Sequence, residues 1–147
     1  MKKQYIRDGR SPIPKDERTS RAMSAIRANN TKPELTARRL LSKWKIKGYR
    51  LNWKKAPGRP DIAFPKKKVA IFVHGCFWHG CPYSKPKLPK THRAFWRKKI
   101  ETNKLRDKRK VRELHRLGWT SITVWACRLD SDRGRDNFVK SVRLALQ

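Results

Sequence analysis

The segment after Thr31 has the apolar periodicity of an amphipathic helix. Thr31 is followed three residues later by Glu34, with a proline between them, which is the usual pattern at a helix start. The sequence predicts a helix that begins here and ends before Gly48, and a shorter helix over about Ser20–Arg27. The apolar residues that recur at i, i+3, i+4 and i+7 are Ala37, Leu40, Leu41 and Trp44.

Three short segments then have the pattern of strands. Tyr49–Trp53 alternates with period two, and Asp61–Phe64 follows a turn rich in proline and glycine. Val69–Val73 is an unbroken apolar run, which suits a strand buried on both faces. The link Pro65–Lys68 is short, so we expect the last two strands to form a hairpin.

The second half of the chain alternates helix and strand. Residues 74–91 lack periodicity and are predicted to form a loop, after which a long helix runs from about His92 to Leu117. Ser121–Trp125 is a fourth strand, which the crossover would make parallel to Val69–Val73, and a last helix spans Asn137–Leu146. Two polar residues interrupt the stripe of the long helix, which consists of Trp96, Ile100, Asn103, Asp107, Val111 and Leu114.

This order of elements predicts a single α/β domain. Four strands in a mixed sheet with helices on both sides form three layers, and we assign residues 19–147 to this domain. Residues 1–18 are basic, contain Gly9 and two prolines, and are predicted to form a flexible arm. Such an arm would either follow a phosphate backbone or remain a disordered tail.

The charge of the chain indicates a polyanionic partner. The chain has 40 Lys and Arg and 11 Asp and Glu, which gives a net charge of +29. The candidate partners are therefore DNA, RNA and an anionic membrane. The apolar run Val69–Val73 is too short to cross a bilayer, which argues against a membrane partner, and no signal peptide precedes the domain, so we expect a cytoplasmic location. Basic nucleic-acid-binding proteins without catalysis share this charge balance, so charge alone does not decide the function.

A carboxylate at a strand start suggests metal chemistry. Asp61 opens one strand of the hairpin, and the other strand ends 12 residues later at Val73. The hairpin brings these ends together, beside His74. Hydrolysis of a phosphodiester needs a hard cation held by carboxylate and carbonyl oxygens. The alternative is that Asp61 only caps the turn after Pro60.

The segment His74–Cys81 combines cysteines, histidines and aromatic residues. The chain has an odd number of cysteines: Cys76, Cys81 and, at the end of the fourth strand, Cys127. In a reducing compartment this suggests a zinc site or buried thiols rather than disulfides. Large aromatics in a loop of a basic protein suit stacking on bases or insertion between base pairs. The alternative for Phe77 and Trp78 is a small hydrophobic cluster beneath the loop.

Several short stretches together resemble the very short patch repair endonucleases (Vsr type). The resemblance covers about residues 18–128, with the stretches in the family's order. It implies a fold similar to the PD-(D/E)XK nucleases and a nick on the 5′ side of the thymine in a T·G mismatch. The stretches are Ser20–Arg27, Thr31–Glu34, Gly58–Asp61, His74–His79, Phe95–Trp96, Lys99–Ile100, Asn103, Arg106–Asp107, Gly118–Trp119 and Trp125–Cys127.

The resemblance also implies roles for individual residues at the catalytic site. Asp61 becomes the Mg²⁺-binding carboxylate, and Val73, where the family usually has threonine, contributes its backbone carbonyl. His74 and His79 become the catalytic histidines, with Glu34 supporting them.

Further matches fall on positions that contact DNA. Phe77, Trp78 and Trp96 match an aromatic wedge that enters the base stack, and Met23 matches a residue that enters from the opposite groove. Lys99 and Asn103 match positions that read the mismatched pair, which would explain a polar residue on the helix stripe. We therefore expect a monomer that acts on duplex DNA with a T·G mismatch and that interacts with mismatch repair proteins.

The zinc site departs from the family pattern. Cys76, Cys81 and Cys127 match three ligand positions of a structural Zn²⁺, but the fourth falls at Tyr83 or Ser84, neither of which is a usual ligand. Three alternatives remain: His92 completes the site, a water molecule completes it, or the site binds zinc weakly. Two alternatives to a mismatch nicking enzyme remain: a restriction-type nuclease of the same fold that acts on paired DNA, and a non-catalytic nucleic-acid-binding protein.

Overall fold

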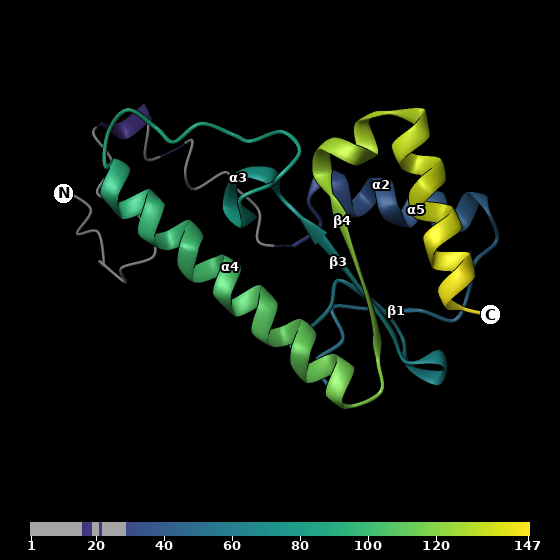
Figure 1. The fold of residues 1–147 in the computed structure, drawn as a ribbon. Coiled ribbons are helices and arrows are strands. Elements are labelled where there is room, and N and C mark those ends of the chain that lie inside the picture. The colour runs from purple at the N-terminus through teal and green to yellow at the C-terminus, as the bar shows by residue number, and fades with distance from the viewer. Residues whose placement is uncertain (1–15, 19–20, 22–28) are drawn as a thin grey trace, which may run out of the picture.

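The computed structural model describes residues 16–18, 21 and 29–147 (Figure 1). Most of the predicted arm and most of the predicted helix Ser20–Arg27, including Met23, lie outside the described residues. None of the helices in the described part of the chain is both long and apolar enough to span a bilayer.

Four strands form one mixed sheet in the order β1-β2-β3-β4. β2 (Ile62–Phe64) pairs antiparallel with β1 (Arg50–Leu51) and with β3 (Val69–His74), whereas β3 pairs parallel with β4 (Thr120–Trp125). The predicted hairpin and the parallel crossover are both confirmed. β1 is shorter than the predicted strand because Asn52 has a positive φ of 48°, which ends the extended backbone.

Helices cover both faces of the sheet (Figure 1). α2 (Lys32–Lys43) and α5 (Asp132–Ala145) lie on one face, and α4 (Arg93–Arg116) lies on the other. Side chains of β3 alternate between them: Val69, Ile71 and Val73 join the core with α2 and α5, whereas Phe72 packs with Leu114 of α4. The apolar run is buried on both faces, as predicted, and the three-layer α/β fold is confirmed.

Two helix ends differ from the prediction. α2 stops at Lys43, so Trp44 caps the helix with 42% of its surface exposed and with the Arg143 guanidinium over its ring. α5 begins at Asp132 rather than Asn137 because the Ser131 hydroxyl accepts a hydrogen bond from the Gly134 N–H and caps the helix start.

The segment predicted as a loop contains a single helical turn, α3 (Cys76–His79). Gly80 ends this turn with a φ of 65°, and a Cβ at this position would lie 2.2 Å from the Cε of Lys104 on α4. The prediction of an irregular loop over residues 74–91 was wrong here because four residues are too few to show a helical period. Two short 3₁₀ helices, η1 (Pro65–Lys67) and η2 (Ala126–Asp130), complete the fold.

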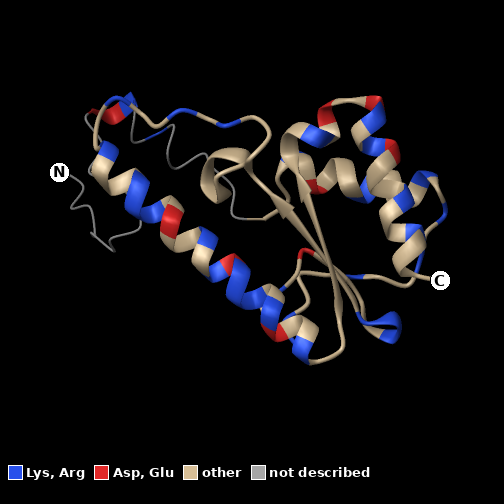
Figure 2. Ribbon diagram, in the orientation of Figure 1, with Lys and Arg blue, Asp and Glu red and all other residues tan. Residues whose placement is uncertain are grey.

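Lys and Arg occur along most of the described chain (Figure 2). Lys and Arg follow α4 along its length and gather at η1, while Asp and Glu are few. This distribution suits contacts with a polyanion along an extended face rather than in one pocket.

Candidate active site and cysteine cluster

Asp61 and the end of β3 meet at one edge of the sheet. Asp61 directly precedes β2, and its carboxylate Oδ2 accepts a hydrogen bond of 2.7 Å from the Val73 N–H. The antiparallel register, in which Ile62 faces Ile71, brings the two together. The predicted proximity of Asp61 to the end of β3 is therefore present at Val73.

The Asp61 carboxylate is short of compensating positive charge. Burial raises its pKa from 3.8 to about 6, the Val73 N–H opposes this rise, and the nearby Glu34 carboxylate adds to it. The charges of His79 and Arg38 lower the pKa but offset only part of this rise. A cation at this place would favour the ionised form of the carboxylate.

Glu34 approaches the same site from the start of α2. Only 5% of its surface is exposed, and its carboxylate accepts hydrogen bonds from the Asn30 N–H at 3.0 Å and the Thr31 hydroxyl at 3.1 Å. Arg38 lies 3.5 Å from the same carboxylate. Thr31 is the N-cap residue of α2, as its spacing to Glu34 predicts, but its hydroxyl donates to Glu34 instead of accepting from the helix backbone.

Two histidines stack at this edge. The rings of His74, at the end of β3, and His79, at the end of α3, lie 3.9 Å apart at an angle of 4°. Burial, together with the charges of His79 and Lys110, lowers the pKa of His74 to about 4, against the opposing effect of Asp107. His74 is therefore neutral near pH 7, and its buried Nδ1 has no hydrogen-bond partner among the described residues.

Asp107 on α4 completes this group. Its Oδ2 lies 2.6 Å from Nδ1 of His79, and the ligand atoms of His74, His79 and Asp107 all lie within 4.8 Å of one another. Burial would raise the pKa of Asp107, but the hydrogen bond and the charge of His79 outweigh it, so the pKa lies below its ordinary value. The sequence alone predicts no catalytic role for Asp107; the signal it carries is a carboxylate that interrupts the apolar stripe of the helix.

The aromatic residues of α3 and α4 pack against one another. Ring centroids of Phe77, Trp78 and Trp96 lie 5.3 to 5.5 Å apart with edge-on geometry. Phe77 and Trp78 are half-buried, whereas Trp96 is 9% exposed. The side chain of Asn103 donates a 2.8 Å hydrogen bond to the Trp78 carbonyl, and Lys99 lies one turn earlier on α4. In the free protein, therefore, the aromatic residues form a small cluster beside the histidines.

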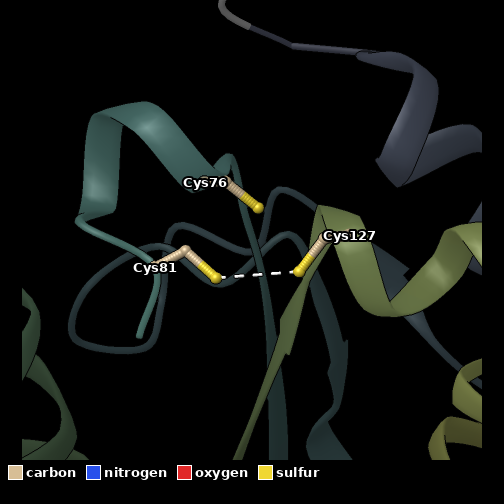
Figure 3. Close-up of side chains that lie close together, drawn as sticks. All are labelled: Cys76, Cys81 and Cys127. Atoms are coloured by element: carbon tan, nitrogen blue, oxygen red, sulfur yellow. Dashed lines mark hydrogen bonds between the residues drawn. The ribbon is translucent and has the colours of Figure 1, made fainter. Parts of the chain in front are cut away.

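The three cysteines converge beside this cluster (Figure 3). Their sulfur atoms all lie within 4.8 Å of one another, with 3.7 Å between Cys81 and Cys127, and all three thiols are free. His92 does not belong to this group. Cys76 comes from α3, Cys81 follows Gly80, and Cys127 lies on η2, so the group ties α3 to the end of β4.

Hydrogen bonds make the cysteines chemically unequal. Burial raises the pKa of Cys81, but hydrogen bonds from Ser84, Tyr83 and Cys127 outweigh it and leave the pKa below its ordinary value. Burial and the neighbouring Cys76 and Cys81 raise the pKa of Cys127. Cys81 is thus the thiol that ionises most readily of the two.

Comparison with known proteins gives a consistent result. The family model for the DNA mismatch endonuclease Vsr matches residues 13–85. The type II nicking enzyme V.XorIIP of Xanthomonas oryzae is 44% identical over 118 residues, which cover 80% of this chain and 85% of that protein. V.NmeAIP of Neisseria meningitidis is 40% identical, covering 73% and 76%, and the DNA mismatch endonuclease Vsr of Escherichia coli is 38% identical, covering 80% and 72%. The chain therefore belongs to the Vsr family of DNA mismatch endonucleases.

Proposed function

We propose that this protein nicks one strand of duplex DNA on the 5′ side of the thymine in a T·G mismatch, with Mg²⁺ as its catalytic cofactor. The observation that supports this most directly is the group at the edge of the sheet. The half-buried carboxylate of Asp61 bonds to the end of β3 and is influenced by the charge of His79, which stacks on His74 and is paired with Asp107. This set provides the parts needed for metal-assisted hydrolysis of a phosphodiester.

Asp61 and the backbone carbonyl of Val73 are the proposed Mg²⁺ ligands. Oxygen donors of this kind suit a hard cation, and the raised pKa of Asp61 fits a carboxylate that a cation would complete. When bound, the cation supplies charge neutralisation at the phosphate and acidity for the attacking water. Val73 offers no hydroxyl, so only its carbonyl can take part.

His79 is the proposed proton acceptor. If Nδ1 carries the proton that bonds to Asp107, Nε2 is left free to accept a proton from water. The neutral His74 stacks on this ring and holds its plane, and Glu34 adds negative charge near Asp61. Asp107 is thus a positioning residue, since it acts through His79.

The aromatic cluster is the proposed sensor of the mismatch. Phe77, Trp78 and Trp96 would insert into the base stack from one groove, with Met23 entering from the other. Lys99 and Asn103 would contact the mismatched bases. Opening the stack costs a few kcal/mol and less where pairing is poor, so a wedge favours a mismatch over a paired site. Trp78 directly precedes His79 on α3, so insertion would also position the phosphate.

Cys76, Cys81 and Cys127 are the proposed ligands of a structural Zn²⁺. Sulfur atoms in a tetrahedral zinc site lie about 3.8 Å apart, given Zn–S bonds of about 2.3 Å. The 3.7 Å between Cys81 and Cys127 fits this spacing. The site would fix α3, and with it His79, against the end of β4.

Cleavage of two DNA duplexes that differ in a single base pair tests the proposed function. One duplex carries a single T·G pair and its twin carries T·A at the same position, and each is incubated with and without Mg²⁺. We expect a nick 5′ of the thymine only in the T·G duplex and only with the metal. Equal cleavage of both duplexes would instead indicate a nuclease for paired DNA. Binding without cleavage in any divalent metal would indicate a non-catalytic protein.

A further inference from the structure

The cysteine cluster gathers three metal ligands, and the structure offers no evident fourth. Among the residues that the structure describes, no further His, Cys, Asp or Glu lies within 4.8 Å of all three sulfur atoms. His92 is exposed at the N-terminal cap of α4 and is not part of the group. A closed structural zinc site has four protein ligands, so this cluster is one ligand short.

The segment after Cys81 contacts the cluster without supplying that ligand. The Ser84 N–H donates to the sulfur of Cys81 at 3.5 Å, and the Ser84 side chain also hydrogen-bonds to Cys81, so Ser84 acts as a donor to a ligand. Tyr83 is 56% exposed, and the guanidinium of Arg128 lies 3.9 Å from the centre of its ring. The stacking on Arg128 accounts for the position of the tyrosine ring, so no bond from its phenol oxygen to a metal is needed to explain that position.

We propose that Cys76, Cys81 and Cys127 hold Zn²⁺ without a fourth side chain, and that an exchangeable water occupies the open position, where a small thiol can displace it. Three protein ligands and one solvent ligand are the arrangement of reactive zinc sites, whereas four protein ligands characterise inert structural ones. The zinc of this protein would therefore be more easily reached by competing ligands than that of a four-ligand site. This inference rests on the zinc part of the proposed function and is independent of nicking.

Cobalt substitution of the full-length, reduced chain tests the open position. Co²⁺ bound to thiolates gives visible absorption that reports the ligand set, and 2-mercaptoethanol serves as the probe. We expect the spectrum of the wild type to change saturably as the thiol is added, with the cobalt retained on the protein. Ser84→Cys places a fourth thiolate at the residue whose side chain hydrogen-bonds to Cys81, so its spectrum should not respond, and a chelator should remove its zinc at least about tenfold more slowly.

Three conservative variants identify any hidden ligand. Tyr83→Phe, Ser84→Ala and His92→Ala should each keep the cobalt spectrum of the wild type and its response to thiol. A changed spectrum in one of them before thiol is added would identify that side chain as the fourth ligand and overturn the inference. A wild-type spectrum that ignores the thiol would overturn it as well.

Metal analysis distinguishes failure of the open position from failure of the proposed zinc site and of the proposed nicking activity. Binding of neither zinc nor cobalt would reject both the zinc site and its open position. The cleavage assay with T·G and T·A duplexes would still decide the nicking activity by itself. Binding of one zinc with an unresponsive cobalt spectrum would reject only the open position.

Discussion

At the scale of single residues, the placement of the Asp61 carboxylate is unfavourable for the free protein but favourable for binding a cation. Its half-buried carboxylate loses solvation and lies near another carboxylate, which is unfavourable for the free protein, and the same placement makes it ready to bind a cation. Asp61→Asn keeps an oxygen that can accept the hydrogen bond from the Val73 N–H but removes the charge. We expect the variant to nick T·G duplex at least about 10³-fold more slowly while its DNA affinity stays nearly unchanged.

Single-turnover cleavage and fluorescence anisotropy measure these two quantities. Asp136→Asn is a suitable control, because Asp136 is exposed on α5 and takes no part in the proposed site. A cleavage rate in Asp61→Asn close to that of the wild type would place the active site elsewhere.

The same substitution should affect stability with a defined dependence on pH. The pKa of Asp61 is about 6 in the folded chain against an ordinary value of 3.8, so between these values the folded state holds a proton that the unfolded state has lost. The contribution of Asp61 to the stability of the wild type therefore becomes more favourable as the pH falls from 7 to 4. Asp61→Asn should be more stable than the wild type by on the order of 1–3 kcal/mol at pH 7.

Urea unfolding in the absence of divalent metal, from pH 4 to pH 7, measures this difference. It should shrink as the pH falls and disappear below about pH 4, where the carboxyl is protonated in both states. A variant that is less stable than the wild type at pH 7 would contradict the cause given for the raised pKa.

Asp107 provides a second test at the residue level. Asp107→Asn removes the charge that faces Nδ1 of His79 and allows the amide to present either its oxygen or its nitrogen. We expect the single-turnover cleavage rate to fall roughly 10²- to 10⁴-fold, the range typical for loss of acid–base catalysis, with little change in DNA affinity. Equal losses of rate and affinity would mean that Asp107 serves only to hold α3 on α4.

Among the elements, the contact between α3 and α4 links recognition to cleavage. Trp78 packs edge-on against Phe77 and Trp96 and precedes His79. We expect Trp78→Ala to lose most of its cleavage of T·G duplex while non-specific binding, which basic side chains provide, changes little. A fluorescent base analogue beside the mismatch should brighten when the wild type binds and stay dim with the variant.

Trp44→Ala is the matched control, because Trp44 caps α2 and lies against Arg143 of α5 instead of the α3–α4 contact. It should behave as the wild type does in both measurements. An unchanged ratio of T·G to T·A cleavage in Trp78→Ala would reject the wedge and leave the aromatic residues as a packing cluster.

The elements also show what a sequence can and cannot predict. Val69–Val73 and the stripe of α4 were predictable because burial imposes an apolar run or a repeating pattern. α3 is too short for a period, and its helical turn depends on contacts with α4, such as the hydrogen bond from Asn103 to the Trp78 carbonyl. The pairing of His79 with Asp107 joins residues 28 positions apart, and no local pattern encodes it.

For the whole molecule, the net charge of +29 should dominate the affinity for DNA. Each phosphate that a lysine or arginine neutralises releases counterions, so affinity falls steeply with salt. We expect the affinity for both T·G and T·A duplexes to drop by roughly 10³-fold or more between 50 and 200 mM salt. Fluorescence anisotropy across that range measures the slope. Affinity that hardly changes with salt would mean that DNA is not the main partner of this charge.

α3 also restricts how this enzyme can change over generations. Its four consecutive residues are a cysteine of the metal cluster, two members of the aromatic cluster and a histidine of the proposed active site. A single-codon insertion or deletion would disturb all three sites together, so this stretch has almost no room for neutral drift. We therefore expect that related enzymes with specificity for another lesion differ on α4 or elsewhere and retain these four codons.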